Sequence, residues 1–228
     1  MNLKVIAFDA DDTLFVNEPY FQETEQKFCA LMSDYLSHQG LSQELFRTEI
    51  ANLDLYGYGI KGYTLSMIEA AMKISNNTIS MEIIEKIIAL GKELLQKPIE
   101  LLDGVEDTLQ ALHGKYKLVV ATKGDLKDQR RKLHDSGLGK YFHHIEVMSD
   151  KQEKDYTDLL NRLEINPKAF FMIGNSLKSD VLPVLAIGGH AVHIPYHTTW
   201  EHEKISHKVE HPNFKTLEKI SDVLEILL

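Results

Sequence analysis

Short apolar runs rich in Val, Ile and Phe recur along this chain and are separated by segments of helical periodicity. Runs typical of buried strands lie at 3–8, 117–121, 145–148, 169–173 and 191–194. Apolar residues recur at steps of three and four from 103 or 104 to 113 and over 126–135, 153–163 and 177–187. This alternation predicts an α/β fold: a doubly wound, Rossmann-like parallel sheet with helices on both faces and right-handed connections.

The segment from Pro19 to about Leu95 interrupts the alternation with helical patterns alone. Four helices are expected, at 21–37, 43–53, 64–72 and 81–95. The stretch 53–63 contains three glycines and three tyrosines and predicts a loop. An all-helical block between two strands of one sheet must leave the sheet and pack by itself. We therefore expect two domains, a core at 1–17 plus 98–228 and an inserted all-helical domain at 18–97.

Composition limits the class of protein and its partners. The chain has 228 residues and 43% hydrophobic content, enough for a sizeable core. With 25 Lys and Arg against 34 Asp and Glu, the net charge of −9 argues against a nucleic-acid partner. A single cysteine, Cys29, cannot form an intrachain disulfide and favours a reducing compartment. There is no apolar run of roughly 20 residues and no signal-peptide pattern. We expect a soluble cytoplasmic protein without a membrane partner.

The C-terminal third contains six histidines between positions 190 and 211. Their irregular spacing, without Cys or paired Asp, does not favour a zinc site, and most are expected on the surface or at helix caps. His197 and Trp200 follow the last predicted strand and are candidates for the rim of a site. Residues 214–228 are expected to close the fold with a segment that ends in a helix.

Three acidic residues, Asp9, Asp11 and Asp12, follow the first predicted strand directly. Asp9 and Asp11 point to the same side of an extended backbone. Two carboxylates about 4 Å apart repel by roughly 4 kcal/mol at an effective dielectric of 20. Such a pair needs a bound cation or a proton on one member, whereas a single Asp here would be an ordinary helix cap.

Polar residues also follow three later predicted strands. Thr122 follows the run KLVVA, Lys151 follows IEVM, and Asn175 and Asp180 lie in the segment GNSLKSD after AFFMI. The amides after Thr122, at Lys123 and Gly124, could bind an anion. Each residue alone is explained as a cap, a turn or a surface charge. Their joint position at the carboxyl ends of four strands, where open α/β sheets bind ligands, predicts one site.

The ordered set of motifs resembles the haloacid dehalogenase (HAD) superfamily. DADDTLF at 9–15 is similar to its first motif, Thr122 to its second, Lys151 to its third and GNSLKSD to its fourth. The helical block lies where many members carry a cap domain between motifs one and two. The resemblance implies phosphoryl transfer through an aspartyl-phosphate.

The resemblance also implies a role for each matching residue. Asp9 corresponds to the nucleophile, and Asp11 to the general acid that later acts as a base. Thr122 would bind the phosphoryl oxygens and Lys151 would neutralise charge. Neighbouring substrate contacts are expected at Asp12, Thr13, Lys123 and Gly124. Mg²⁺ is the expected cofactor, and its candidate ligands are Asp9, the Asp11 carbonyl, Asn175 and Asp180.

Two motifs depart from the simplest pattern of the family. Asn175 stands where the fourth motif often begins with Asp, which predicts weaker or altered metal binding. Lys151 and Lys154 both suit the third motif. Lys151 is preferred because it lies 24 residues before Asn175 (175 − 151 = 24), while Lys154 falls inside a predicted helix.

The expected function is a Mg²⁺-dependent phosphatase acting on a small phosphorylated metabolite. Asp11 disfavours a dehalogenase, because displacement of halide from carbon needs no proton for a leaving oxygen. Lys61 is the one candidate for the Schiff-base lysine of a phosphonatase. A phosphomutase and a non-catalytic binding protein of the same fold remain alternatives. A monomer or a homodimer is expected.

A cap hinged near Asn17 and Pro98 would open for substrate and close over it. Cap residues that face Asp9 would then select the substrate. The candidates are Tyr56, Tyr58, Lys61 and Tyr63, and the alternative is that these tyrosines pack in the core of the cap.

Overall fold

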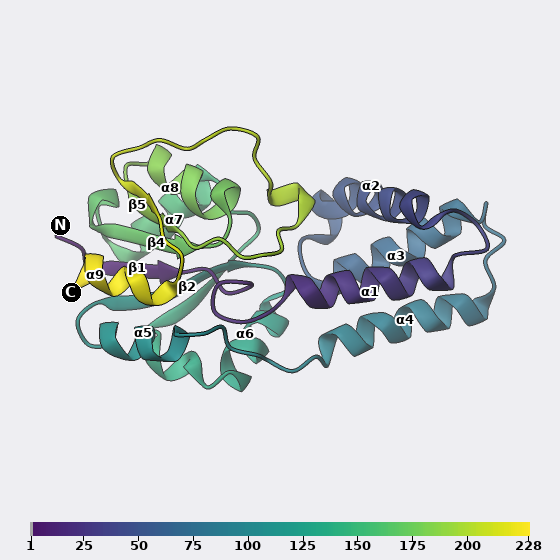
Figure 1. Cartoon of the computed structure of the whole chain (residues 1–228), viewed down its shortest axis with the longest axis horizontal. Helices are drawn as coiled ribbons and strands as arrows, with labels where there is room; N and C mark the ends of the chain where they lie inside the picture. The colour runs from purple at the N-terminus through teal and green to yellow at the C-terminus, as the bar shows by residue number, and fades with distance from the viewer. Residues whose placement is uncertain (1) are drawn as a thin grey trace. The chain divides into compact units, whose positions relative to one another are not determined.

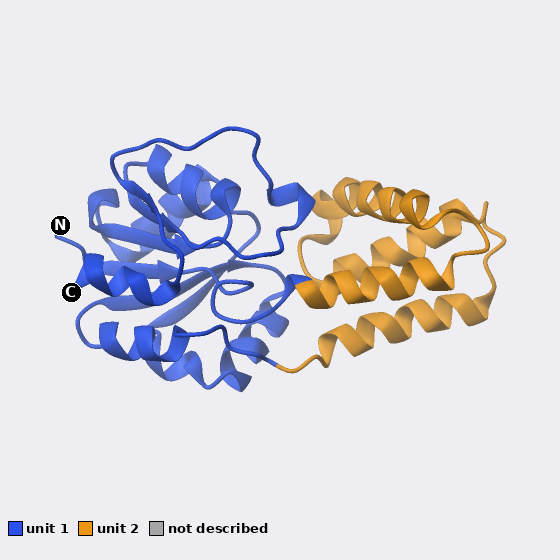
Figure 2. Cartoon of the chain, viewed as in Figure 1, with its two compact units in different colours: residues 1–18, 99–228 blue, residues 19–98 orange. Residues whose placement is uncertain are grey.

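The computed structural model describes residues 2–228, which form two compact units (Figure 2). The sheet unit comprises the residues up to Glu18 together with 99–228, and the helical unit comprises 19–98. The junctions follow Glu18 and Pro98, one residue from the boundaries expected from the sequence. In the part of the chain described, no helix is both long and apolar enough to cross a bilayer.

The sheet unit contains six parallel strands in the order β3-β2-β1-β4-β5-β6 (Figure 1). The strands are β1 Val5–Phe8, β2 Lys117–Lys123, β3 His144–Met148, β4 Phe170–Gly174, β5 His190–His193 and β6 Phe214–Thr216. The central strands β1 and β4 are buried along their whole length. Such near-continuous apolar strands are typical of a parallel sheet covered on both faces, and the predicted Rossmann-like α/β fold is confirmed.

Helices cover both faces of the sheet. Alternate residues of the strands pack on one face against α5 (Val105–Leu112) and α9 (Leu224–Leu227). On the other face they pack against α7 (Glu153–Leu163) and α8 (Leu182–Ala186). Helix α6 (Leu126–Asp135) follows β2 and contacts β3. The chain order of strands and helices is the order that the periodicity predicts.

Two segments of the sheet unit differ from the prediction. The helix expected over 177–187 begins as a turn of π-helix, Leu177–Val181, and becomes α-helical only at Leu182. The C-terminal segment contains β6, which the sequence pattern missed. With three residues, of which two are exposed, β6 is too short and too polar for a period-two pattern.

The helical unit contains α1 (Glu18–Leu31), α2 (His38–Tyr56), α3 (Ile60–Ile74) and α4 (Met81–Leu95). Side chains from all four helices form one core that includes Phe28, Leu41, Met67 and Ile87. Serine side chains cap the N-termini of α2 and α4: Ser37 Oγ accepts from Gly40 N, and Ser80 Oγ accepts from Ile83 N.

The loop expected at 53–63 is much shorter in the structure. Helix α2 continues to Tyr56 and α3 begins at Ile60. Gly57 and Gly59 have φ angles of 69° and 108°, values that allow the chain to reverse within three residues. The glycine pattern located the turn, and the helical propensity of the flanking residues shortened it. The first helix is also shorter than the predicted 21–37, ending at Leu31.

Candidate active site

The strand-end residues predicted from the sequence lie at one edge of the sheet. Asp9 directly follows β1, and Thr122 is the second-last residue of β2. Lys151 lies three residues after β3, and Asn175 directly follows β4. Phe8, the last residue of β1, pairs with Val120 of β2 and Ile173 of β4. The parallel register therefore brings the ends of these strands together.

Lys151 lies between two carboxylates. Its Nζ donates to Asp9 Oδ1 and, at 2.7 Å, to Asp180 Oδ1, and only 2% of the side chain is exposed. Burial alone would lower the pKa of Lys151, but the charges of Asp180 and Asp9 raise it above its usual range. Burial also raises the pKa of Asp9, against the effect of Lys151. Lys154 is exposed on α7, so Lys151 is the lysine that meets the expected nucleophile.

Asp11 has different partners, which come from α6. Lys132 Nζ donates to Asp11 Oδ1 at 2.8 Å, and Gln129 Nε2 donates to Asp11 Oδ2 at 2.8 Å. Lys132 also donates to Asn17 Oδ1 at 2.8 Å. Both α6 side chains are buried. Asp9 and Asp11 are thus held by separate cations, Lys151 for Asp9 and Lys132 for Asp11.

Asp12 points toward the start of α1. Its φ is 57°, and its carboxylate accepts hydrogen bonds from Asn17 N at 2.8 Å and Glu18 N at 3.0 Å. Its own amide donates to Phe15 O at 2.8 Å. The carboxylate and the amide of Asp12 therefore both bond within the protein. In this structure the residue stabilises the turn before α1, and its role as a substrate contact stays a prediction. Thr13 stays at the site, where Thr13 Oγ1 lies 3.5 Å from Asp9 Oδ2.

The end of β2 supplies Thr122, Lys123 and Gly124. Thr122 is buried, and its Oγ1 lies 3.2 Å from Lys123 O. The Lys123 side chain is held by Ser179 Oγ at 3.0 Å and by Glu203. Gly124 has φ 123°, and a Cβ there would lie 3.0 Å from Gln129 Nε2. Glycine therefore lets Gln129 pack over this turn and reach Asp11.

The loop after β4 holds Asp180 close to the backbone. Ser176 N donates to Asp180 Oδ2 at 2.9 Å, and a Cβ at Gly174 would lie 2.2 Å from that same oxygen. Only glycine fits at position 174. Nε2 of His193 donates to Asn175 O at 2.9 Å, and burial lowers the pKa of this histidine. His193 thus stabilises the loop after β4 from a partly buried position. From the sequence, most of the six C-terminal histidines were expected on the surface or at helix caps.

The donor set fits a small, hard cation such as Mg²⁺. One end of the Asn175 amide lies 3.2 Å from Asp9 Oδ2 and 3.2 Å from the Asp11 carbonyl oxygen. Adjacent ligands of an octahedral Mg²⁺ with 2.0–2.1 Å bonds are about 2.9 Å apart, close to this spacing. Thr13 Oγ1 also lies 3.2 Å from this end of the amide and donates to the Asn175 oxygen when the oxygen is there. With the nitrogen at that end, the amide donates to Asp9 Oδ2, the Asp11 carbonyl and Thr13 Oγ1. The fit depends on the amide and the carbonyl, because residues 2–228 contain no group of three His, Cys, Asp or Glu arranged for a metal.

The four candidate substrate contacts of the expected cap, Tyr56, Tyr58, Lys61 and Tyr63, lie in the helical unit. Tyr56 ends α2, and its hydroxyl donates to Glu69. Tyr58 lies in the short turn between α2 and α3, and Lys61 is exposed in the first turn of α3. Tyr63 is buried in the core of this unit and packs against Phe21, with ring centroids 5.1 Å apart. For Tyr63 the core-packing interpretation therefore holds.

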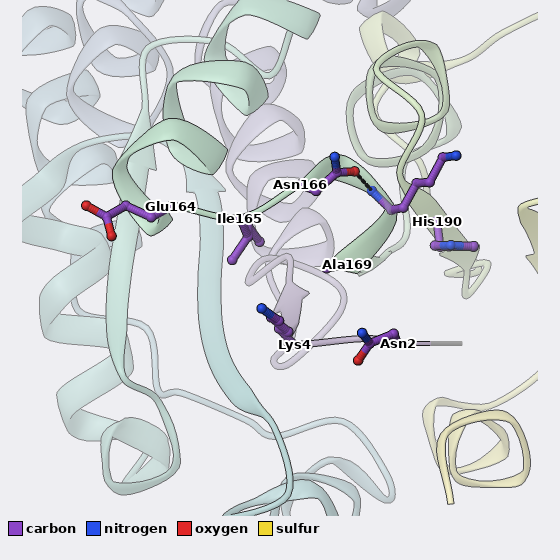
Figure 3. A pocket seen from close by; sticks show the side chains of 8 residues that line it. Asn2, Lys4, Glu164, Ile165, Asn166, Ala169 and His190 are labelled. Carbon is purple, nitrogen blue, oxygen red and sulfur yellow. Dashed lines mark hydrogen bonds between the residues drawn. The ribbon is translucent and has the colours of Figure 1, made fainter.

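A cavity of about 520 Å³ lies at the opposite edge of the sheet (Figure 3). Its lining includes Lys4, which precedes β1, Ala169, which precedes β4, and His190, which begins β5. These positions mark the amino ends of the strands. None of the predicted site residues lines this cavity, so it is separate from the candidate active site.

Comparison with known proteins supports the same family. A family model described as haloacid dehalogenase-like hydrolase matches residues 3–188. This chain belongs to that family. The search of curated proteins found no match to this chain. A crystal structure of a haloacid dehalogenase-like family hydrolase from Xanthomonas campestris is 37% identical, with a TM-score of 0.89 over 99% of this chain and 91% of the other. That similarity covers both units of this HAD-like hydrolase.

Two more distant structures share the fold of this HAD-like hydrolase. A predicted phosphoglycolate phosphatase from Haemophilus somnus is 18% identical, with a TM-score of 0.65 over 100% of this chain and 99% of the other. A 2-haloacid dehalogenase from Pseudomonas syringae pv. Tomato is 18% identical, with a TM-score of 0.66 over 99% and 98%. The shared fold therefore accommodates proteins described as phosphatases and as dehalogenases, and the chemistry must be argued from the site.

Three contacts of the site were missed by sequence reasoning. Gln129 and Lys132 lie on the most polar helix of the sheet unit, and Glu203 lies in an irregular segment. The spacing of Gln129, Lys132 and Glu203 in the sequence matches no motif. The available signal was positional, since α6 follows the strand that carries Thr122, and two of its side chains three residues apart face the same way.

Proposed function

We propose that this HAD-like hydrolase is a Mg²⁺-dependent phosphatase that cleaves a small phosphate monoester through an aspartyl-phosphate. The observation that carries the proposal is the pair of carboxylates after β1. Asp9 is buried beside Lys151, and Asp11 accepts from Lys132 and Gln129. The two carboxylates have separate environments, which suits a nucleophile and a proton carrier with different tasks.

In the first step, an oxygen of Asp9 attacks phosphorus and the bond from phosphorus to the ester oxygen breaks. Asp11, which must bind a proton before substrate is cleaved, gives that proton to the ester oxygen, which leaves as an alcohol. In the second step, Asp11 takes a proton from water, the water oxygen bonds to phosphorus, and the bond between Asp9 and phosphorus breaks. Inorganic phosphate is released and both residues return to their starting states.

The other residues of the edge would stabilise charge and orient the phosphoryl group. The buried Thr122 would donate its hydroxyl to a phosphoryl oxygen, and Lys151 would offset part of the negative charge of Asp9 and Asp180. Mg²⁺, when bound by Asp9, the Asp11 carbonyl, Asn175 and Asp180, would supply positive charge against the anionic substrate. Such local positive charge answers the problem that a protein of net charge −9 repels phosphates at long range.

A carboxylate at position 11 favours ester cleavage over dehalogenation. Halide leaves carbon without a proton, so a proton carrier two residues after the nucleophile has no task in that reaction. Lys61 lies in the helical unit, exposed in the first turn of α3, and we do not propose phosphonate cleavage. A phosphomutase would return the phosphoryl group to a second hydroxyl, and product analysis separates this outcome from release of phosphate.

The test is release of inorganic phosphate from a panel of small phosphate monoesters, with Mg²⁺ and with excess chelator. We expect hydrolysis that needs Mg²⁺ and that falls by at least about 100-fold in Asp9→Asn, because the amide is a poor nucleophile. Lys154→Met is the matched control and keeps wild-type activity. The same protein is given a panel of 2-haloacids, where no halide release is expected. Absence of ester hydrolysis in the wild type, or full activity in Asp9→Asn, contradicts the proposal.

A further inference from the structure

The connection between β5 and β6 reaches the active-site edge through one side chain. This connection, residues 194–213, is irregular except for a turn of 3₁₀ helix at Glu201–Glu203. Glu203 ends that turn, and only 12% of its side chain is exposed. A carboxylate at this depth needs partners that offset the loss of its hydration.

Glu203 has partners from two other segments. Lys123 Nζ donates to Glu203 Oε1 at 2.6 Å. Ser179 Oγ donates to Glu203 Oε2 at 2.5 Å, and Ser176 Oγ donates to the same oxygen. Lys123 Nζ also donates to Ser179 Oγ at 3.0 Å, so the group closes on itself. Burial alone would raise the pKa of Glu203, but Lys123 and the hydrogen bonds lower it to about 2, so the carboxylate is charged at neutral pH.

The partners of Glu203 adjoin the residues expected to bind phosphate and metal. Lys123 directly follows Thr122. Ser176 directly follows Asn175, and its amide donates to Asp180 Oδ2 at 2.9 Å. Ser179 directly precedes Asp180, and Tyr156 OH donates to Ser179 O at 3.0 Å. Glu203 therefore joins the end of β2 to the loop that carries Asn175 and Asp180.

Neighbouring contacts hold the turn that carries Glu203. Lys178 Nζ donates to His202 O at 2.8 Å, and the rings of Trp200 and His202 lie 4.9 Å apart. The turn therefore contacts the loop after β4 through two successive residues, His202 and Glu203. Stability alone does not account for a buried ion pair, since apolar residues of similar size often stabilise a fold as well or better.

We propose that Glu203 is a positioning residue that fixes the end of β2 and the 175–180 loop relative to each other, so that Thr122 and the metal ligands Asn175 and Asp180 act on one phosphoryl group. The inference rests on the proposed phosphatase function and adds a residue that none of the motifs includes. Ligands of a metal are oriented by the groups that hydrogen-bond to them and to their loops, and loss of such partners weakens metal binding.

The test compares Glu203→Gln with Glu201→Gln. Glu201 is the matched control because it lies in the same turn, its side chain is 65% exposed, and its partner is Lys204. Mg²⁺ binding is measured by calorimetry without substrate, and turnover is measured separately. We expect Glu203→Gln to raise the Kd for Mg²⁺ by about 10-fold or more and to lower kcat by a similar factor. Glu201→Gln should stay within about twofold of wild type in both, since an exposed pair contributes little.

A second variant removes the risk that an unpaired Lys123 prevents folding. Lys123→Met combined with Glu203→Met removes both charges, and we expect the same loss of Mg²⁺ affinity because the two segments are no longer joined. Wild-type Mg²⁺ affinity in either Glu203 variant, or absence of Mg²⁺ binding in the wild type, overturns the inference. Mg²⁺ binding that depends on Glu203 in a protein that hydrolyses no ester contradicts only the proposed function.

Discussion

The ion pairs at the active-site edge of the sheet unit differ from those of the helical unit. At the edge, Lys151, Lys132 and Lys123 are buried or nearly so, and each has a carboxylate partner within 2.8 Å. In the helical unit, pairs such as Lys86 with Glu82 and Lys27 with Glu23 join half-exposed or exposed side chains on helix surfaces. The first kind loses most of its hydration, and the second keeps it.

The difference bears on the proposed function, because burial gives the two kinds of ion pair different energetic costs. Removing an ion pair from water costs several kcal/mol per ion, and the attraction between its members offsets this only with good geometry. Three such pairs at one edge are expensive as a means of stabilising a fold. They are what a site needs if it must bind a multiply charged anion and move a proton. The exposed pairs of the helical unit are ordinary surface contacts.

The largest effect should follow from removing the cation between two buried carboxylates. Lys151→Met leaves Asp9 and Asp180 as adjacent buried anions, so the free energy of unfolding should fall by about 3 to 5 kcal/mol. Denaturant unfolding in chelator measures it. Lys154→Met, three residues away and exposed on α7, is the control and should be close to wild type. Equal stability of the two variants would remove the distinction between the buried and exposed charges.

An intermediate effect, with a defined pH dependence, is expected at Glu203. Its pKa is about 2 in the folded protein against an ordinary 4.5, so its stabilisation is complete above pH 4.5 and is lost as the pH falls toward 2. The shift corresponds to roughly 3 kcal/mol at neutral pH. Urea unfolding of wild type and Glu203→Gln between pH 7 and pH 3 should show a difference that shrinks only below about pH 5. A pH-independent difference would mean that the charge of Glu203 does not matter.

The smallest effect is expected at an exposed pair of the helical unit. Lys86 and Glu82 lie four residues apart on α4 with 55% and 73% of their side chains exposed. Because solvent screens this pair, Lys86→Met should leave the unfolding midpoint within about 2 °C of wild type. A larger drop, measured by thermal unfolding with Lys92→Met as a second surface control on α4, would contradict the contrast between the two units.

The sequence predicted the parts of the site that belong to strand ends. Asp9, Thr122, Lys151 and Asn175 each follow or end an apolar run, and parallel pairing makes such ends neighbours whatever the loops do. Lys151 could be preferred to Lys154 from spacing, and the structure places it against Asp9. The sheet could be predicted for the same reason, because strands buried on both faces have an unmistakable composition.

The features that the sequence did not predict depend on packing against segments distant in the chain. Lys132 and Gln129 look like surface residues of a polar helix, and only the packing of α6 beside the first motif turns them toward Asp11. Tyr63 looks like a loop residue until α3 is seen to begin at Ile60. The strand β6 has three residues, and its partner β5 determines it more than its own pattern does.

By itself, the sequence determined the α/β fold, the helical insertion and the set of polar groups at the ends of β1 to β4. These follow from local periodicity and from the geometry of parallel strands, which need no knowledge of distant packing. Only the tertiary structure decided which cation each carboxylate meets, Lys151 for Asp9, Lys132 for Asp11 and Lys123 for Glu203. These partners are 142, 121 and 80 residues apart in the chain. Coulomb interactions and hydration depend on distance and burial, which sequence separation does not encode.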